Sequence, residues 1–149
     1  RSKHEMPMDL WPTFWTKIAG MIKSGNVFSN IQVKEEIDRG GDELTDWMRD
    51  NVPTGFYIEN ELDVMGKYAE VMNWAQSCTV YRPDAISEFA SVADAYLVAT
   101  AAAKGYTLVT NETADPYCRR RVKIPDACNA LRVRCCDLNT VLRELNITI

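Results

Sequence analysis

Two acidic side chains are candidates for chemistry because each accompanies an apolar run. Asp94 is the only charged residue between Glu88 and Lys104, within ASVADAYLVATAAAK, and Glu112 follows the apolar stretch YTLVT and Asn111. A buried carboxylate requires hydrogen-bond donors, a cationic partner or a metal, since burial disfavours its charged form. If these acids converge with a third, a divalent cation would relieve their repulsion.

The local sequence around Asp94 allows two interpretations. Ser91 to Asp94 fits a capping box, in which Asp94 reaches back to the backbone of Ser91. A helix that begins near Asp84 would instead place Asp94 in its middle. The local pattern favours neither alternative.

Glu36 is the third candidate acid, within NIQVKEEIDRGG. At about 100° per residue, Glu35 lies opposite Val33, whereas Glu36 lies about 60° to its side. Glu36 should therefore border the buried face formed by Val33 and Ile37, and Glu35 should point to solvent. On this segment alone, a solvated pair of charges is the simpler interpretation.

Polar and basic residues lie on both sides of Glu112 in the sequence. A turn is the simpler role for Asn111 and Asp115. The run Arg119 to Arg121, with Lys123, is the one dense basic stretch, and we expect it either to hold a nucleic-acid backbone or to form a solvated loop. The net charge of -4 argues against broad electrostatic binding of nucleic acid.

The His and Cys residues argue against other kinds of catalytic or metal site. The single His is His4, near the start of the chain, so a catalytic Ser-His-Asp or Cys-His arrangement is disfavoured. Five Cys without CxxC spacing argue for free thiols and against a zinc site or a disulfide framework. Thiol exchange at Cys135 and Cys136 is also disfavoured, because that strand should be buried.

Apolar spacing and punctuation by Gly and Pro predict helices separated by short apolar strands. The expected helices span 10–26, 30–41, 42–51, 61–76 (capped by Asn60), 83–104, 124–131 and 137–145. The expected strands are 27–30, 106–110 and 133–136, and 55–59 is an extended piece or a loop. This order indicates an α/β fold with a parallel sheet covered on both faces. No apolar run approaches the roughly 18 residues of a membrane span, so we expect one cytoplasmic domain over 1–149.

These segments resemble a known family. The pattern SNIQVKEEIDRG, then ASVADAYLVATAAAKGYTLVTNE, then a closing strand and helix, resembles the PIN domain from about Trp11 to the end. The ending KIPDACNAL and CCDLNTVLREL is similar to a bacterial PIN-like branch that contains toxins. Paired, ADAYLVATA and TNE are moderately specific, whereas each alone would be weak.

The resemblance implies a three-layer α/β domain, with a central parallel sheet flanked by helices, that cuts RNA with Mg²⁺ or Mn²⁺. By position, Glu36, Asp94 and Glu112 look like the catalytic metal ligands, and Asp115 like an outer-shell group. Asn111 and Thr110 would lie beside them, and the basic segment would hold the RNA: Arg119, Arg120, Arg121 and Lys123. The expected function is a metal-dependent endoribonuclease, the toxin of a toxin-antitoxin pair, with RNA, an antitoxin and a second copy in a homodimer as partners.

One departure from the family affects this expectation. PIN domains begin with a short strand that ends in a metal-binding Asp, and this chain begins at Arg1 without such a segment. We expect the chain to lack that strand and, on its own, to be impaired in metal binding and cleavage. The alternative function is a catalytically inactive PIN-like module that binds a protein partner.

Overall fold

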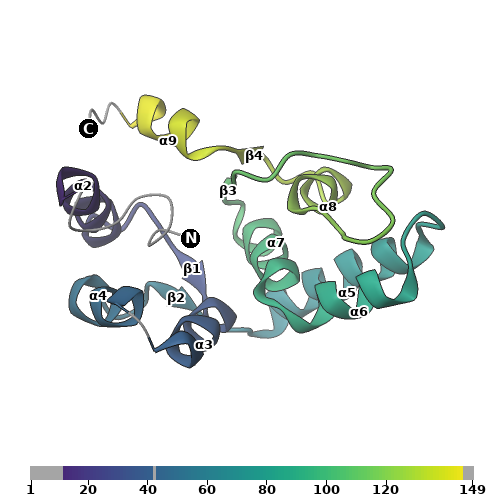
Figure 1. The fold of residues 1–149 in the computed structure, drawn as a ribbon, viewed down its shortest axis with the longest axis horizontal. Coiled ribbons are helices and arrows are strands. Elements are labelled where there is room, and N and C mark those ends of the chain that lie inside the picture. The colour runs from purple at the N-terminus through teal and green to yellow at the C-terminus, as the bar shows by residue number, and fades with distance from the viewer. Residues whose placement is uncertain (1–11, 42, 146–149) are drawn as a thin grey trace. The chain divides into compact units, whose positions relative to one another are not determined.

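A computed structural model of the chain describes residues 12–41 and 43–145. It divides the chain into two compact units, whose described residues are 12–58 and 59–145 (Figure 1). Each unit is considered by itself below. The expectation of one domain over 1–149 stays a prediction.

The first unit contains helices and two short strands. In order these are α2 (Pro12–Lys23), β1 (Ser29–Asn30), α3 (Ile31–Gly40), α4 (Glu43–Asn51) and β2 (Tyr57–Ile58). The two strands pair in parallel, with Ser29 opposite Tyr57. The helices predicted over 10–26, 30–41 and 42–51 are present as α2, α3 and α4, but α2 ends at Lys23 and α3 spans only 31–40.

Local signals explain the limits of α3. Asn30 is fully buried and caps the helix, since its side-chain oxygen accepts a hydrogen bond from the backbone N–H of Gln32 at 2.8 Å. Gly41 ends the helix with φ of 58°, a left-handed conformation that glycine adopts without steric penalty.

The second unit is larger and contains most of the helices. Its elements are α5 (Leu62–Ser77), α6 (Pro83–Ser91), α7 (Ala93–Lys104), β3 (Leu108–Val109), α8 (Ile124–Ala130), β4 (Cys135–Cys136) and α9 (Leu138–Glu144). The core lies between α5, α7 and α8, and buries residues such as Val71, Val98 and Ala127 completely.

Small side chains let α7 pack closely on α5. Ala95 and Ala99 are fully buried on α7, and an alanine allows neighbouring backbones to approach. Tyr96 of α7 stacks on Tyr68 of α5 with ring centroids 4.5 Å apart, and the Tyr68 hydroxyl donates to the carbonyl of Ala90 at 2.9 Å. Burial raises the pKa of Tyr68 to about 12, so this hydroxyl stays a donor at neutral pH.

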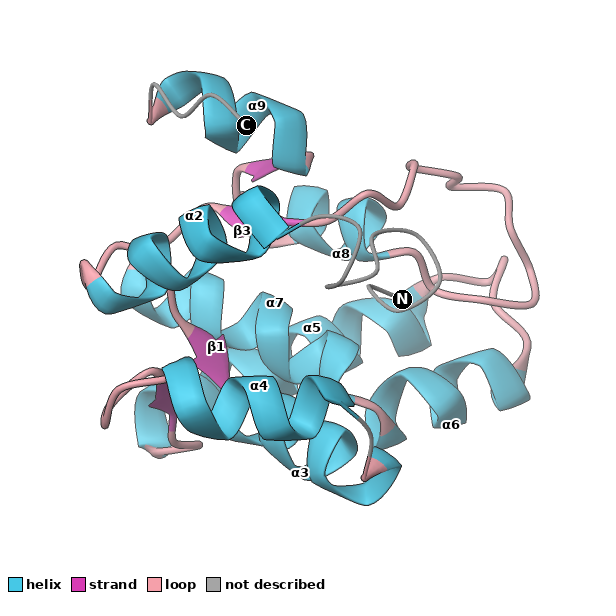
Figure 2. Cartoon of the chain, turned by 60° about the vertical axis from the view of Figure 1, so that its left-hand side comes forward, coloured by secondary structure: helices cyan, strands magenta, loops and turns pink. Residues whose placement is uncertain are grey.

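The sheet prediction is confirmed only in part. The strands pair in parallel, β1 with β2 and β3 with β4, but each has two residues, and the four described strands form two separate pairs (Figure 2). In β3, Leu108 is buried and Val109 is exposed, so the expectation of burial on both faces is wrong there. The architecture is mixed helix and strand, mostly helical.

Two further expectations concern cysteines and membranes. All five cysteines, which lie within the described residues, are free thiols as predicted. Burial raises the pKa of Cys128, Cys135 and Cys136, which disfavours the thiolate that exchange chemistry needs. Within residues 12–41 and 43–145, each helix is too short or too polar to cross a bilayer.

Candidate functional site

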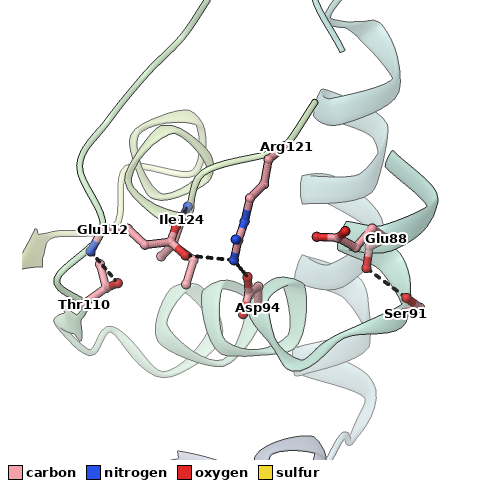
Figure 3. Close-up of polar contacts among 7 residues, drawn as sticks. All are labelled: Glu88, Ser91, Asp94, Thr110, Glu112, Arg121 and Ile124. Carbon is pink, nitrogen blue, oxygen red and sulfur yellow. Dashed lines mark hydrogen bonds and ion pairs between the residues drawn. The ribbon is translucent and has the colours of Figure 1, made fainter. Parts of the chain in front are cut away.

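The position of Asp94 results from a break between two helices. α6 ends at Ser91, Val92 is extended with φ of -104° and ψ of 172°, and α7 begins at Ala93. The Ser91 hydroxyl donates back to the carbonyl of Glu88 at 2.9 Å (Figure 3). Val92 is the N-cap of α7. Both alternatives for Asp94 are therefore wrong, the capping box on Ser91 and the middle of one helix over 83–104.

Asp94 is instead the second residue of α7, with its side chain 24% exposed. A carboxylate in the first turn interacts favourably with the positive end of the helix dipole. Its position is therefore stabilised before any cation is considered.

After α7, the chain runs back through β3 toward the N-terminal end of α7, where Asp94 lies. α7 has 12 residues and is about 18 Å long, and Gly105 ends it in a left-handed conformation with φ of 72°. An extended segment of about six residues covers roughly 20 Å in the opposite direction. Residues that follow β3 therefore return to the N-terminal end of α7.

Glu112 lies at this point, and three backbone interactions fix the segment around it. The N–H of Thr110 donates to the carbonyl of Cys136 at 2.9 Å, which continues the β3–β4 ladder. The N–H of Glu112 donates to the Thr110 hydroxyl at 3.1 Å. Glu112 Oε1 in turn accepts from the N–H of Ile124 at 2.9 Å, so the carboxylate is held at the start of α8.

Arg121 joins the two acids. Its Nη2 lies 3.2 Å from Glu112 Oε2 and 3.8 Å from Asp94 Oδ2 (Figure 3). Because both oxygens contact one nitrogen, their separation cannot exceed the sum of these two distances. The predicted convergence of Asp94 and Glu112 is therefore present, with a guanidinium between them.

Asp115 makes the local contact expected of a turn residue, whereas Asn111 contacts a residue distant in sequence. Asn111 Oδ1 accepts from the N–H of Leu138 at 3.3 Å, which ties the end of β3 to the start of α9. Asp115 Oδ1 accepts from the N–H of Tyr117 at 3.2 Å, and its own N–H donates to Asp126 Oδ2 at 2.9 Å. An outer-shell role for Asp115 stays a prediction.

The basic segment divides into two kinds of residue. Arg119 and Arg120 are exposed, and the backbone of Arg119 is fixed by a hydrogen bond from the N–H of Arg82 at 3.0 Å. Lys123 is half-buried at the N-cap of α8. Arg121 lies against Asp94 and Glu112, and its expected contact with RNA stays a prediction.

Glu36 belongs to α3 in the first unit. It is exposed, and so is Glu35, so the expected difference between them is not seen. Its contribution to a site with Asp94 and Glu112 stays a prediction. Across the described residues, no group of three or more His, Cys, Asp or Glu side chains is arranged to hold a metal.

The donor set of the pair nevertheless suits a hard divalent cation. Mg²⁺ is commonly held by one or two carboxylates together with waters and substrate phosphates. Asp94 and Glu112 supply two such groups, and both lie within 4 Å of one guanidinium nitrogen, at 3.8 and 3.2 Å. The arrangement can therefore attract a cation or a basic group.

The ion pairs of Arg121 and two other features were missed from the sequence. Tyr117 is 85% exposed on the loop between Glu112 and Arg121, and Asp126 anchors that loop through Asp115. The spacing of Glu112 and Arg121 gave no signal, because their contact depends on the path of the intervening loop.

Comparisons with known proteins give a family and no function. No curated protein and no solved structure matches the chain. A family model described as "Domain of unknown function (DUF4411)" matches residues 1–149, and the chain belongs to this family.

Proposed function

We propose that this protein is a metal-dependent endoribonuclease of the PIN type. The observation that carries the proposal is the convergence of Asp94 and Glu112 on one guanidinium nitrogen of Arg121. Two acids far apart in sequence share a cation there, at the carboxyl end of a parallel strand pair, where α/β proteins commonly bind ligands. The resemblance to PIN domains assigns the same two residues to a metal site.

In this proposal Asp94 and Glu112 would hold Mg²⁺ or Mn²⁺, with Asp115 in the outer shell. The bound ion would supply a water of lowered pKa and neutralise charge on the phosphate. Thr110 positions Glu112 through its hydroxyl, and Asn111 fixes the adjoining strand end. These contacts preorganise the segment that carries the Glu112 carboxylate, so the chain does not have to order it when the ion binds.

The basic segment supplies the substrate contact in this proposal. Arg119 and Arg120 are exposed on the loop between Glu112 and Arg121. Lys123 precedes Ile124, whose N–H donates to Glu112. Lys and Arg side chains of this kind bind phosphates in a salt-dependent way. RNA is the proposed substrate, and a toxin role would add an antitoxin partner and a homodimer.

Cleavage of a labelled single-stranded RNA with Mg²⁺ tests the proposal. We expect Asp94→Asn and Glu112→Gln to lower the rate about a hundredfold or more, because each removes a charged ligand. Asp63→Asn is the matched control, since Asp63 pairs with Lys104 at the other end of α7. Equal rates for wild type and Asp94→Asn, or Mg²⁺-independent cleavage, would contradict the proposal.

A second candidate is a protein-binding module without catalysis. The Arg121 ion pairs favour it, because a guanidinium already neutralises part of the acid charge without a metal. This candidate predicts that the purified protein does not cleave RNA and does not bind Mn²⁺ at Asp94.

A further inference from the structure

We infer that Arg121 is a built-in competitor of the divalent cation, and that its guanidinium must leave Asp94 and Glu112 when the ion binds. The inference rests on the proposed function, because competition requires a cation site. It adds a role for Arg121 that differs from the RNA contact expected from the sequence. Figure 3 shows the guanidinium between the two carboxylates.

The acids keep their places without Arg121. Glu112 is fixed by its bonds with Thr110 and Ile124, and Asp94 is fixed by its position in the first turn of α7. Glu112 Oε1 is bound to the N–H of Ile124, whereas Arg121 contacts Oε2. Release of Arg121 would therefore remove its contacts with Glu112 Oε2 and Asp94 Oδ2 without moving the backbone that carries the two acids.

Arg121 is the movable member of the three. Its side chain is 44% exposed, compared with 24% for Asp94 and 17% for Glu112. Partly exposed ion pairs are weak, because water competes for both charges and a long side chain loses rotamer freedom. The guanidinium can therefore withdraw into solvent, where a phosphate of the bound substrate could receive it in a bidentate contact.

Competition lowers the apparent affinity for the ion. When Arg121 has left the acids in only a fraction of molecules, the apparent dissociation constant rises in inverse proportion to that fraction. For two ion pairs of this exposure, we expect a weakening of about threefold to tenfold. Removal of the guanidinium should abolish this effect.

The experiment measures the Mn²⁺ dissociation constant of the full chain by electron paramagnetic resonance of free Mn²⁺ at constant ionic strength, without RNA. We expect Arg121→Gln to bind Mn²⁺ about threefold to tenfold more tightly than wild type. Arg82→Gln is the matched control, because it removes the same charge from an ion pair with Asp84 (3.2 Å). It should leave the constant unchanged, and circular dichroism of each variant checks folding.

Asp94→Asn separates the two claims. Loss of Mn²⁺ binding in Asp94→Asn, with no gain in Arg121→Gln, would overturn the competition and leave the proposed metal site intact. Equal Mn²⁺ binding by wild type and Asp94→Asn, or none in either, would overturn both. A gain of the same size in Arg82→Gln would also overturn the competition, because it would show only the effect of net charge.

Discussion

The two ends of α7 carry different arrangements of charge. At the C-terminal end, the Lys104 ammonium donates to Asp63 Oδ2 at 2.8 Å, beside an open hollow lined by Glu61, Leu62, Asp63 and Lys104. At the N-terminal end, Asp94 and Glu112 share the Arg121 guanidinium at longer distances. One end is a close pair of opposite charges, whereas the other brings two acids to one guanidinium.

This difference indicates which end is suited to function. A simple ion pair on the surface contributes little and needs no further partner. Two carboxylates that share one cation keep a mutual repulsion, which a divalent ion would relieve more fully than a guanidinium. The hollow at Lys104 is thus less informative than the acid pair.

The largest expected effect on stability comes from Glu112. Glu112→Ala removes the acceptor for the N–H of Ile124, a buried residue, and should lower the free energy of unfolding by about 1–3 kcal/mol. Glu112→Gln keeps an acceptor oxygen and loses only the ion pair, so the loss should stay below about 1 kcal/mol. Urea denaturation measures both values.

The two Glu112 variants sharpen the comparison between the ends of α7, because they should affect RNA cleavage and stability differently. Both variants should lose cleavage, but only Glu112→Ala should lose much stability. Equal stability of the two variants would show that the bond with Ile124 does not fix the carboxylate. Glu112 would then be no more firmly positioned than an acid in an ordinary surface ion pair such as Asp63–Lys104.

A smaller effect concerns pH at the opposite end of α7. The hydrogen bond from Lys104, followed by that from the N–H of Val64, lowers the pKa of Asp63 below its ordinary 3.8, and the bond to Asp63 raises the pKa of Lys104 above 10.5. The Asp63 contribution is therefore present above pH 3.8 and is lost as pH falls through the lowered value. The Lys104 contribution is present below pH 10.5 and is lost as pH rises through the raised value.

The difference in Tm between wild type and Asp63→Asn should therefore stay constant from about pH 5 to 9 and narrow in acid. Thermal unfolding followed by circular dichroism at a series of pH values measures it. A difference that changes near neutral pH would mean that the Asp63–Lys104 pair is coupled to another titrating group. The C-terminal end could then no longer serve as the simple reference.

Local signals predicted much of the secondary structure. Gly41 ends α3, Gly105 ends α7, and Asp137 caps α9 through a hydrogen bond from the N–H of Thr140 at 2.8 Å. Each signal depends on a residue's own backbone preference or side-chain oxygen. Such preferences are readable without knowledge of the tertiary structure.

Features that depend on packing were not predicted. No Gly or Pro marks the break at Val92, and the mostly apolar pattern continues across it from Phe89 through Leu97. The residue types therefore give no sign that the helix ends there. Asn60 was expected to cap α5, but Glu61 is the N-cap, and Asp63 instead accepts from the N–H of Val64. The contact of Arg121 with Glu112 needs the closure of a loop, which the residue types alone do not determine.

Anomalous scattering from a crystal of the protein grown or soaked with Mn²⁺ tests the central claim most directly, namely that Asp94 and Glu112 together hold a divalent ion. The account predicts an anomalous peak within about 2.5 Å of a carboxylate oxygen of each residue, with the Arg121 guanidinium displaced from both. Ordered Mn²⁺ elsewhere, with Arg121 still between the two acids, would contradict it.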